Sequence, residues 1–270
     1  MIAPPALSVP FVYERHEIVV SVHVNGQGPF SMLVDTDTDP SAVDNRLARR
    51  LKLRPSGTSG RGQGVGGGSD QVTPFILSNL TLGPIQAHDV AALSSDLAPL
   101  AQAFGHQIDG VLGRSFLKSR IIQIDFVHRQ LDFLNAAPSS IRTARIRYAL
   151  EVKLYGVTVG NKPVTATLDT GNSHYVTVSG HGVAALQLAN LAARAKTSSA
   201  HGYNGAAQVR TITLPALRIA AVNVGSVPAL VFSDQNEEKG EPDINIGNRV
   251  LEKFRTVTFD FRGSGLWLGR

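Results

Sequence analysis

The sequence runs through the same series of predicted elements twice. Each half has a strand, a Gly-containing turn, a second apolar strand and then the dipeptide Asp-Thr, which begins at Asp35 in the first half and at Asp169 in the second. These positions are 134 residues apart, about half of the 270-residue chain. Similarity at one fixed spacing indicates a duplicated structural unit. We therefore expect two similar lobes, with any shared site where they face each other.

The similarity continues downstream of the Asp-Thr turns. Residues 108–134 and 242–268 each predict a short apolar strand ending in Gly, a short helix, and a hairpin containing Asp-Phe. The matched positions are Asp109 with Asp243, Gly113 with Gly247, Leu117 with Leu251, Asp125 with Asp260, and Phe126 with Phe261. We expect a mostly β, bilobal protein with lobes at residues 1–136 and 148–270 and a linker at 137–147, which is rich in Pro, Ser and Arg.

Hydrophobic spacing predicts the remaining elements. Strand-like stretches lie at 72–82 and 209–217, and helical spacing covers 41–53 and 183–196. The two short helices after the Gly-ending strands are predicted at 114–119 and 248–254.

Composition excludes several classes of function. The chain has no cysteine, which excludes disulfides, thiolate metal sites and a cysteine nucleophile. The net charge of +5 comes from scattered basic residues, so we expect no nucleic-acid partner. No apolar run approaches the roughly 20 residues of a membrane-spanning helix. We expect a periplasmic or secreted location after removal of a signal peptide, with a cytoplasmic location as the alternative.

The paired aspartates are the strongest chemical signal in the sequence. Asp35 and Asp169 each follow a buried-type apolar strand, where a carboxylate is costly to desolvate unless it has partners. A pseudo-twofold arrangement would bring both to its axis. Two carboxyls about 3 Å apart share one proton, so one member can activate water while the other protonates a carbonyl oxygen.

Several segments together resemble the aspartic peptidase family, especially its bacterial retropepsin-like branch. They are the Asp-Thr-Gly-Asn-Ser run at 169–173, the apolar segments ending in Gly at 111–113 and 245–247, and the Gly-rich stretch 60–68. The resemblance covers nearly the whole chain as two fused lobes. It implies a pepsin- or retropepsin-like acid protease fold and an endopeptidase that acts on an extended peptide or protein substrate, as a monomer and without metal or cofactor.

The resemblance also assigns residue roles. The catalytic pair would be Asp35 and Asp169, and the hydroxyls of Thr36 and Thr170 would brace the two loops against each other. The other supporting residues would be Asp37, Thr38, Gly171 and Asn172. Residues of the flaps that close over a substrate would be Gly64, Val65, Gly66 and Gly67 in lobe one and Tyr203 and Asn204 in lobe two.

Lobe one departs from the family pattern at Asp37, where Gly is expected. Glycine permits a backbone conformation and a close approach that a side chain obstructs. A third carboxylate beside the pair would also raise the energy of every ionised form. We therefore expect weakened catalysis or a narrower pH range, and the alternative is a catalytically silent protein that binds peptides in the same cleft.

Other interpretations of the same residues are weaker. The alternating aspartates at 35, 37 and 39 suggest a calcium loop, but Pro40 and Arg46 stand where Gly and a bidentate Glu belong. An Asp-x-Asp start also occurs in haloacid-dehalogenase-like phosphatases, whose alternating strands and helices do not match the duplicated β pattern. The Gly-x-Gly-x-x-Gly spacing at 62–67 opens no helix, which argues against a dinucleotide site.

Overall fold

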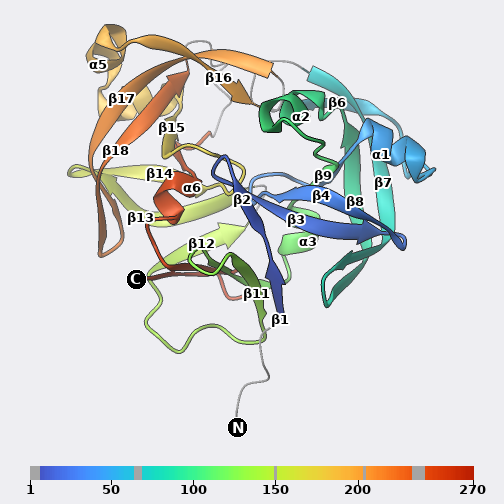
Figure 1. Ribbon diagram of the computed structural model, residues 1–270. Helices are drawn as coiled ribbons and strands as arrows, with labels where there is room; N and C mark the ends of the chain where they lie inside the picture. Colours follow the sequence, from blue (N-terminus) through green and yellow to red (C-terminus); the bar gives the residue numbers. More distant parts are fainter. Residues whose placement is uncertain (1–6, 64–68, 149–150, 203–204, 233–240) are drawn as a thin grey trace.

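The computed structural model describes residues 7–63, 69–148, 151–202, 205–232 and 241–270. The described residues form two β-rich lobes side by side, lobe one in blue to green and lobe two in yellow to red (Figure 1). We define the base sheet as the strands beneath the lobes, to which both halves of the chain contribute. The structure is thus mostly β and bilobal, as the sequence predicts.

Lobe one contains the strands from β2 to β9 and three short helices. The strands are β2 (Val12–Glu14), β3 (Glu17–Val24), β4 (Gln27–Val34), β5 (Ser41–Asp44), β6 (Gly60–Gln63), β7 (Ser69–Leu82), β8 (Ile85–Ser95) and β9 (Gly110–Leu112). The helices are α1 (Asn45–Arg50), α2 (Ala98–Phe104) and α3 (Arg114–Leu117). The strands pair in the order β2-β3-β4-β9-β5-β8-β7-β6.

Lobe two repeats this arrangement. Its strands are β13 (Val152–Val159), β14 (Lys162–Leu168), β15 (Val176–Val178), β16 (Thr197–Gly202), β17 (Gly205–Ile219), β18 (Val222–Phe232) and β19 (Ile244–Ile246). Its helices are α4 (Gly180–Leu186), α5 (Ala189–Arg194) and α6 (Asn248–Leu251). The strands follow the order β13-β14-β19-β15-β18-β17-β16, which matches the lobe-one order from β3 to β6.

The strands that lead to the two aspartates are held in the same way. β4 pairs in parallel with β9, where Val34 is opposite Leu112. β14 pairs in parallel with β19, where Leu168 is opposite Ile246. In each lobe a third strand, β5 or β15, pairs antiparallel with the other side of β9 or β19. Each Asp-Thr turn therefore follows a strand, β4 or β14, whose neighbour, β9 or β19, is paired with other strands on both edges.

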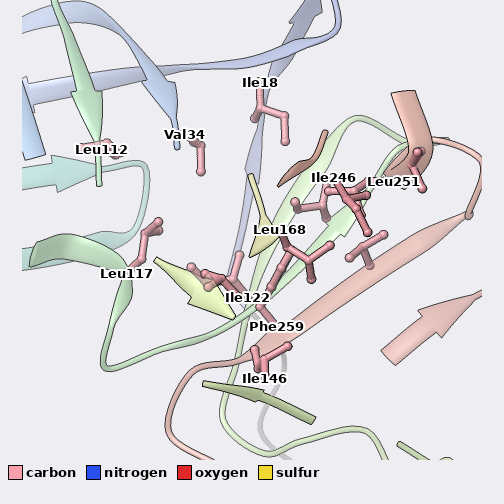
Figure 2. Packing of buried hydrophobic residues seen from close by; sticks show 14 of the residues in the cluster. Ile18, Val34, Leu112, Leu117, Ile122, Ile146, Leu168, Ile246, Leu251 and Phe259 are labelled. Atoms are coloured by element: carbon pink, nitrogen blue, oxygen red, sulfur yellow. The ribbon is translucent and has the colours of Figure 1, made fainter. Parts of the chain in front are cut away.

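The base sheet joins the lobes by strand pairing. It runs β1-β11-β10-β20-β21-β12, formed by β1 (Leu7–Pro10), β10 (Ile121–Asp125), β11 (Gln130–Leu134), β12 (Ala144–Tyr148), β20 (Thr256–Asp260) and β21 (Gly265–Gly269). The central contact is β10 with β20, where Ile122 is opposite Phe259. Both side chains are buried in a core that continues into both lobes, where Val34 and Leu168 belong to it (Figure 2).

The two longer helices that the sequence predicts are shorter in the structure. The first four residues of the predicted 41–53 helix form strand β5 instead, because they pair with β8 and β9. Asp44 then starts α1, with its Oδ1 accepting a hydrogen bond from the backbone N–H of Arg46. The predicted 183–196 helix starts earlier and is divided into α4 and α5, because Gln187 has a positive φ of 61°.

Two other predicted segments differ from the structure or lie partly outside it. The end of the predicted linker, 144–147, belongs to strand β12 of the base sheet. Backbone hairpins β6–β7 and β16–β17 flank the predicted flap tips. The flap residues Gly64, Val65, Gly66, Gly67, Tyr203 and Asn204 lie outside the described residues. In the described part of the chain, no helix has the length and apolar character needed to cross a membrane.

Strand β19, which is paired on both edges, supplies a test of what supports the site. Ile246 is fully buried and its carbonyl accepts the hydrogen bond from the backbone N–H of Asp169. We expect Ile246→Ala to lower the free energy of unfolding by about 2–5 kcal/mol, because it leaves a cavity in a packed core. Urea denaturation measures this, with Ile76→Ala as control, since Ile76 is 42% exposed. Equal losses in the two variants would contradict this role for Ile246.

Candidate active site

Both Asp-Thr turns begin at a fixed point of the fold. The backbone N–H of Asp35 donates to the carbonyl of Leu112, and that of Asp169 donates to the carbonyl of Ile246, each at 3.0 Å. These bonds extend the parallel pairing of β4 with β9 and of β14 with β19 by one residue. The two aspartates are therefore placed by rigid strands and not by free loops.

Thr36 and Thr170 bind the two turns to each other. The backbone N–H of Thr36 donates to Oγ1 of Thr170, and the N–H of Thr170 donates to Oγ1 of Thr36, both at 3.1 Å. The Thr36 hydroxyl donates to the carbonyl of Leu168 (2.8 Å), and the Thr170 hydroxyl donates to the carbonyl of Val34 (2.7 Å). Both threonines are buried. This reciprocal set of bonds brings the two lobes together at the aspartates.

Gly171 contacts both carboxyl groups. Its N–H donates to Oδ1 of Asp169 at 2.7 Å. A Cβ built on Gly171 would lie 2.3 Å from Oδ2 of Asp35, closer than any side chain could be accommodated. The backbone of Gly171 therefore lies close to both carboxyls, and the approach to Asp35 leaves no room for a side chain at this position.

Asp35 has a complete set of hydrogen-bond donors. Its Oδ1 accepts from the backbone N–H groups of Asp37 (2.7 Å) and Thr38 (3.1 Å). Its Oδ2 accepts from the Thr38 hydroxyl at 2.6 Å. Donors aimed at a carboxyl favour its charged form. This surrounding is suited to a carboxylate.

Asp169 is in a less favourable surrounding for charge. Its Oδ1 accepts from the N–H of Gly171, and its Oδ2 accepts from Nδ2 of Asn245 at 2.9 Å. Burial in the surrounding protein raises its pKa well above the ordinary range, and the charges of Asp35 and Asp37 raise it further. The two hydrogen bonds act in the opposite direction but do not offset the burial. The surroundings of Asp169 therefore favour its protonated form.

Asp37 differs from the expectation drawn from sequence. Neither Asp37 nor Gly171 has a positive φ, so the expected backbone conflict at Asp37 does not arise. Burial and the neighbouring charges of Asp35 and Glu151 raise the pKa of Asp37 to about 8. At neutral pH the third carboxyl is largely neutral, so the expected penalty from a third negative charge is relieved by protonation.

The third predicted aspartate of this loop does not join the other two. Asp39 is paired with Arg114, whose Nη1 lies 3.0 Å from Oδ2. Asp35 instead directs its oxygens to Thr38 and to backbone donors. Within the described ranges, no group of three or more His, Cys, Asp or Glu residues is arranged to hold a metal ion.

Glu17 is a site residue that the sequence reasoning missed. It starts β3 and is only 7% exposed, and its side chain is hydrogen-bonded to Ser173. Its Oε2 has no partner among the residues that the structure describes. Burial raises its pKa well above the ordinary value, as do the nearby charges of Asp35 and Asp169. The repeat spacing could have indicated it, because Glu151 stands 134 positions later.

Asn245 is the second residue that was missed. Its Nδ2 donates to Asp169 and also lies 3.3 Å from Oδ2 of Asp37, while its Oδ1 accepts from Nδ2 of Asn172 at 2.8 Å. The side chain of the predicted supporting residue Asn172 therefore reaches the Asp169 carboxyl through Asn245, while its backbone N–H donates to the Asp169 carbonyl at 3.3 Å. A polar residue inside the apolar segment Ile244–Ile246 was the available signal.

Comparison with known proteins agrees with this geometry. A family model described as aspartyl protease matches residues 20–116 and again residues 155–250, so that each match contains one of the two aspartates. None of the curated proteins compared with the chain matches it. Because the two matches together span well over half of the chain, and each falls on one lobe, the protein belongs to the aspartyl protease family.

Proposed function

We propose that the protein is an aspartic endopeptidase in which Asp35 and Asp169 activate water to hydrolyse a peptide bond. Membership of the family supports aspartic protease chemistry in general. The observation that carries the more specific proposal is the reciprocal bonding of Thr36 and Thr170, with Gly171 close to both carboxyls. One chain supplies both aspartates, so we propose that a monomer is active.

The surroundings of the two carboxyls suggest different starting roles. The Asp35 carboxylate, stabilised by its donors, removes a proton from water as the water oxygen attacks the carbonyl carbon. The proton on Asp169 passes to the carbonyl oxygen, which gives a neutral tetrahedral diol. Asp35 then donates its new proton to the departing amine nitrogen while Asp169 accepts a hydroxyl proton, and the C–N bond breaks. The cycle returns both carboxyls to their first state.

A silent peptide-binding protein of the same fold is the second candidate function. The observation that favours it is Asp37 at the position where lobe two has Gly171. In the proposed enzyme, protonated Asp37 adds little charge at neutral pH and below, which keeps the pair functional. Binding of peptides without turnover would favour the second candidate.

Replacement of Asp169 tests the proposed catalytic pair. We expect Asp169→Asn to lower kcat for cleavage of an unfolded protein by about 10²- to 10⁴-fold, because an amide cannot carry the exchanged proton. The measurement is peptide-bond cleavage followed by mass spectrometry between pH 3 and 8. A statine-type mimic of the tetrahedral diol should inhibit the unmodified protein.

Asp89→Asn is the matched control for this prediction. Asp89 is exposed and has a positive φ of 52°, a conformation that Asn also adopts readily. We expect full activity in this variant. If Asp169→Asn cleaves as fast as Asp89→Asn, Asp169 has no part in the chemistry.

The raised pKa of Asp37 predicts how stability depends on pH. Unfolded Asp ionises near pH 4, whereas folded Asp37 ionises at about 8, so the folded state holds one more proton between these values. Stability must therefore fall as pH rises through this window, by about 1.4 kcal/mol per pH unit for one proton. We expect Asp37→Asn to remove this part of the slope.

Urea denaturation at pH 5, 6 and 7 measures the difference between the two proteins. Glu17 and Asp169 also have raised pKa values, but they are present in both proteins, so their contribution largely cancels. Parallel dependence of the free energy of unfolding on pH in the two proteins would contradict a protonated Asp37. Asp89→Asn again serves as the control.

A further inference from the structure

Asn245 lies on strand β19 of lobe two, at a position where lobe one has an apolar residue. The register places Asn245 of β19 between Thr167 of β14 and Thr177 of β15. The corresponding row in lobe one consists of Leu33, Val111 and Ala42. The lobe-one row belongs to a buried apolar cluster whose other members are Val19, Leu97, Phe104 and Ile108. Asn245 is therefore not the counterpart of a polar residue, and the packing requirements of the duplicated fold do not explain it.

The orientation of the Asn245 amide is fixed by a chain of hydrogen bonds. The backbone N–H of His174 can only donate, and it donates to Oδ1 of Asn172 at 2.9 Å. The NH₂ group of Asn172 must then face Oδ1 of Asn245, which it contacts at 2.8 Å. This leaves the NH₂ group of Asn245 directed at the carboxyls of Asp169 and Asp37.

In lobe one a different residue donates the hydrogen bond to Oδ2 of the aspartate. Thr38, which corresponds to Asn172, donates its hydroxyl directly to Oδ2 of Asp35 at 2.6 Å. In lobe two the donor to Oδ2 of Asp169 is Asn245 at 2.9 Å. A hydroxyl has one proton to donate, whereas an amide has two that point in fixed directions. The two protons of Asn245 match the two carboxyls it faces.

We propose that Asn245, oriented by Asn172, is a positioning residue that holds Asp169 and Asp37 together and makes Asp37 compatible with the catalytic pair. Of Asp35, Asp37 and Asp169, only Asp37 has no aspartate at the corresponding position of the other lobe, where Gly171 stands. Asn245 is likewise without a polar counterpart in lobe one, where Val111 stands. Asp37 and Asn245, the two residues without a counterpart, contact each other across the lobes, with Nδ2 of Asn245 at 3.3 Å from Oδ2 of Asp37.

A kinetic double-mutant cycle tests this proposal, which rests on the proposed function for its activity readout. We expect Asn245→Val, the lobe-one residue, to lower kcat by roughly 10- to 100-fold with little change in KM, because in the proposed reaction Asp169 becomes charged when it gives up its proton and then lacks this hydrogen bond. In an Asp37→Gly background the same substitution should cost less, by roughly threefold or more, because only the bond to Asp169 is then lost. Asn190→Val on exposed α5 is the control.

Two further variants keep the test decisive. Asn172→Thr combined with Asn245→Val rebuilds the lobe-one arrangement and should recover kcat relative to Asn245→Val alone. If Asn245→Val does not fold, Asn245→Thr offers one proton in place of two, and its loss of kcat should be smaller in the Asp37→Gly background. Equal costs of the Asn245 substitution with and without Asp37, or unchanged kcat in Asn245→Val, would overturn the proposal.

A stability measurement tests Asn245 even if no peptide is cleaved. Its hydrogen bond lowers the pKa of Asp169, so its removal should make ionised Asp169 less favourable in the folded state. The loss in free energy of unfolding in Asn245→Val should then be larger at pH 9 than at pH 4. The other carboxyls that interact with Asp169, Asp37 or both are Asp35, Glu17 and Glu151.

Asp35, Glu17 and Glu151 are present in both the unmodified protein and Asn245→Val, so the comparison isolates the effect of the Asn245 amide. A loss that does not vary with pH would overturn the proposal. Failure of the proposed function would appear differently, as absence of cleavage by the unmodified protein at every pH.

Discussion

The reciprocal bonding of Thr36 and Thr170 is the interaction on which the site depends. Each hydroxyl accepts from the other turn's backbone N–H and donates to the carbonyl that precedes the other aspartate. Because both side chains are buried, loss of either hydroxyl would leave backbone groups unpaired away from water, which is costly. The arrangement therefore exists only when the two lobes are assembled. The base sheet and the shared core provide that assembly, since Ile122 of one half lies opposite Phe259 of the other.

Bringing the lobes together also concentrates carboxyl groups, and protonation is how the fold tolerates them. Asp35, Asp37, Asp169 and Glu17 interact with one another, and burial raises the pKa of the last three. Asp35 accepts three close hydrogen bonds from its own turn, whereas Asp169 accepts one from its own turn and one from Asn245. Such a difference between the two carboxyls would suit the base and acid roles that we propose for them. The difference follows from the unequal hydrogen bonding of two loops of similar sequence.

Sequence alone predicted the repeated features well and the unrepeated ones poorly. The 134-residue spacing located both Asp-Thr turns, both Gly-ending strands and the two-lobed β fold, because each signal occurs twice. Helix boundaries failed where strand pairing overrides periodicity, as at β5, which the spacing of apolar residues assigned to a helix. Asn245 and Glu17 were missed because their partners lie far away in the chain, and hydrogen bonds between such residues have no local pattern. The raised pKa of Asp37 was not predicted, since it depends on burial that a sequence does not display.

The departures from symmetry are possible because both lobes are encoded in one chain. In a dimer of identical halves, an aspartate at the Asp37 position would occur twice and would replace Gly171, whose missing Cβ leaves room for the Asp35 carboxyl. The close approach of Gly171 to Asp35 would then be obstructed, and two additional carboxyls would lie beside the pair. In the fused chain only one loop carries the additional carboxyl, and only the facing strand carries the amide that contacts it. One chain can therefore carry the glycine that close contact demands in one turn and, in the other turn, a side chain that accepts a hydrogen bond from Asn245 of the opposite lobe.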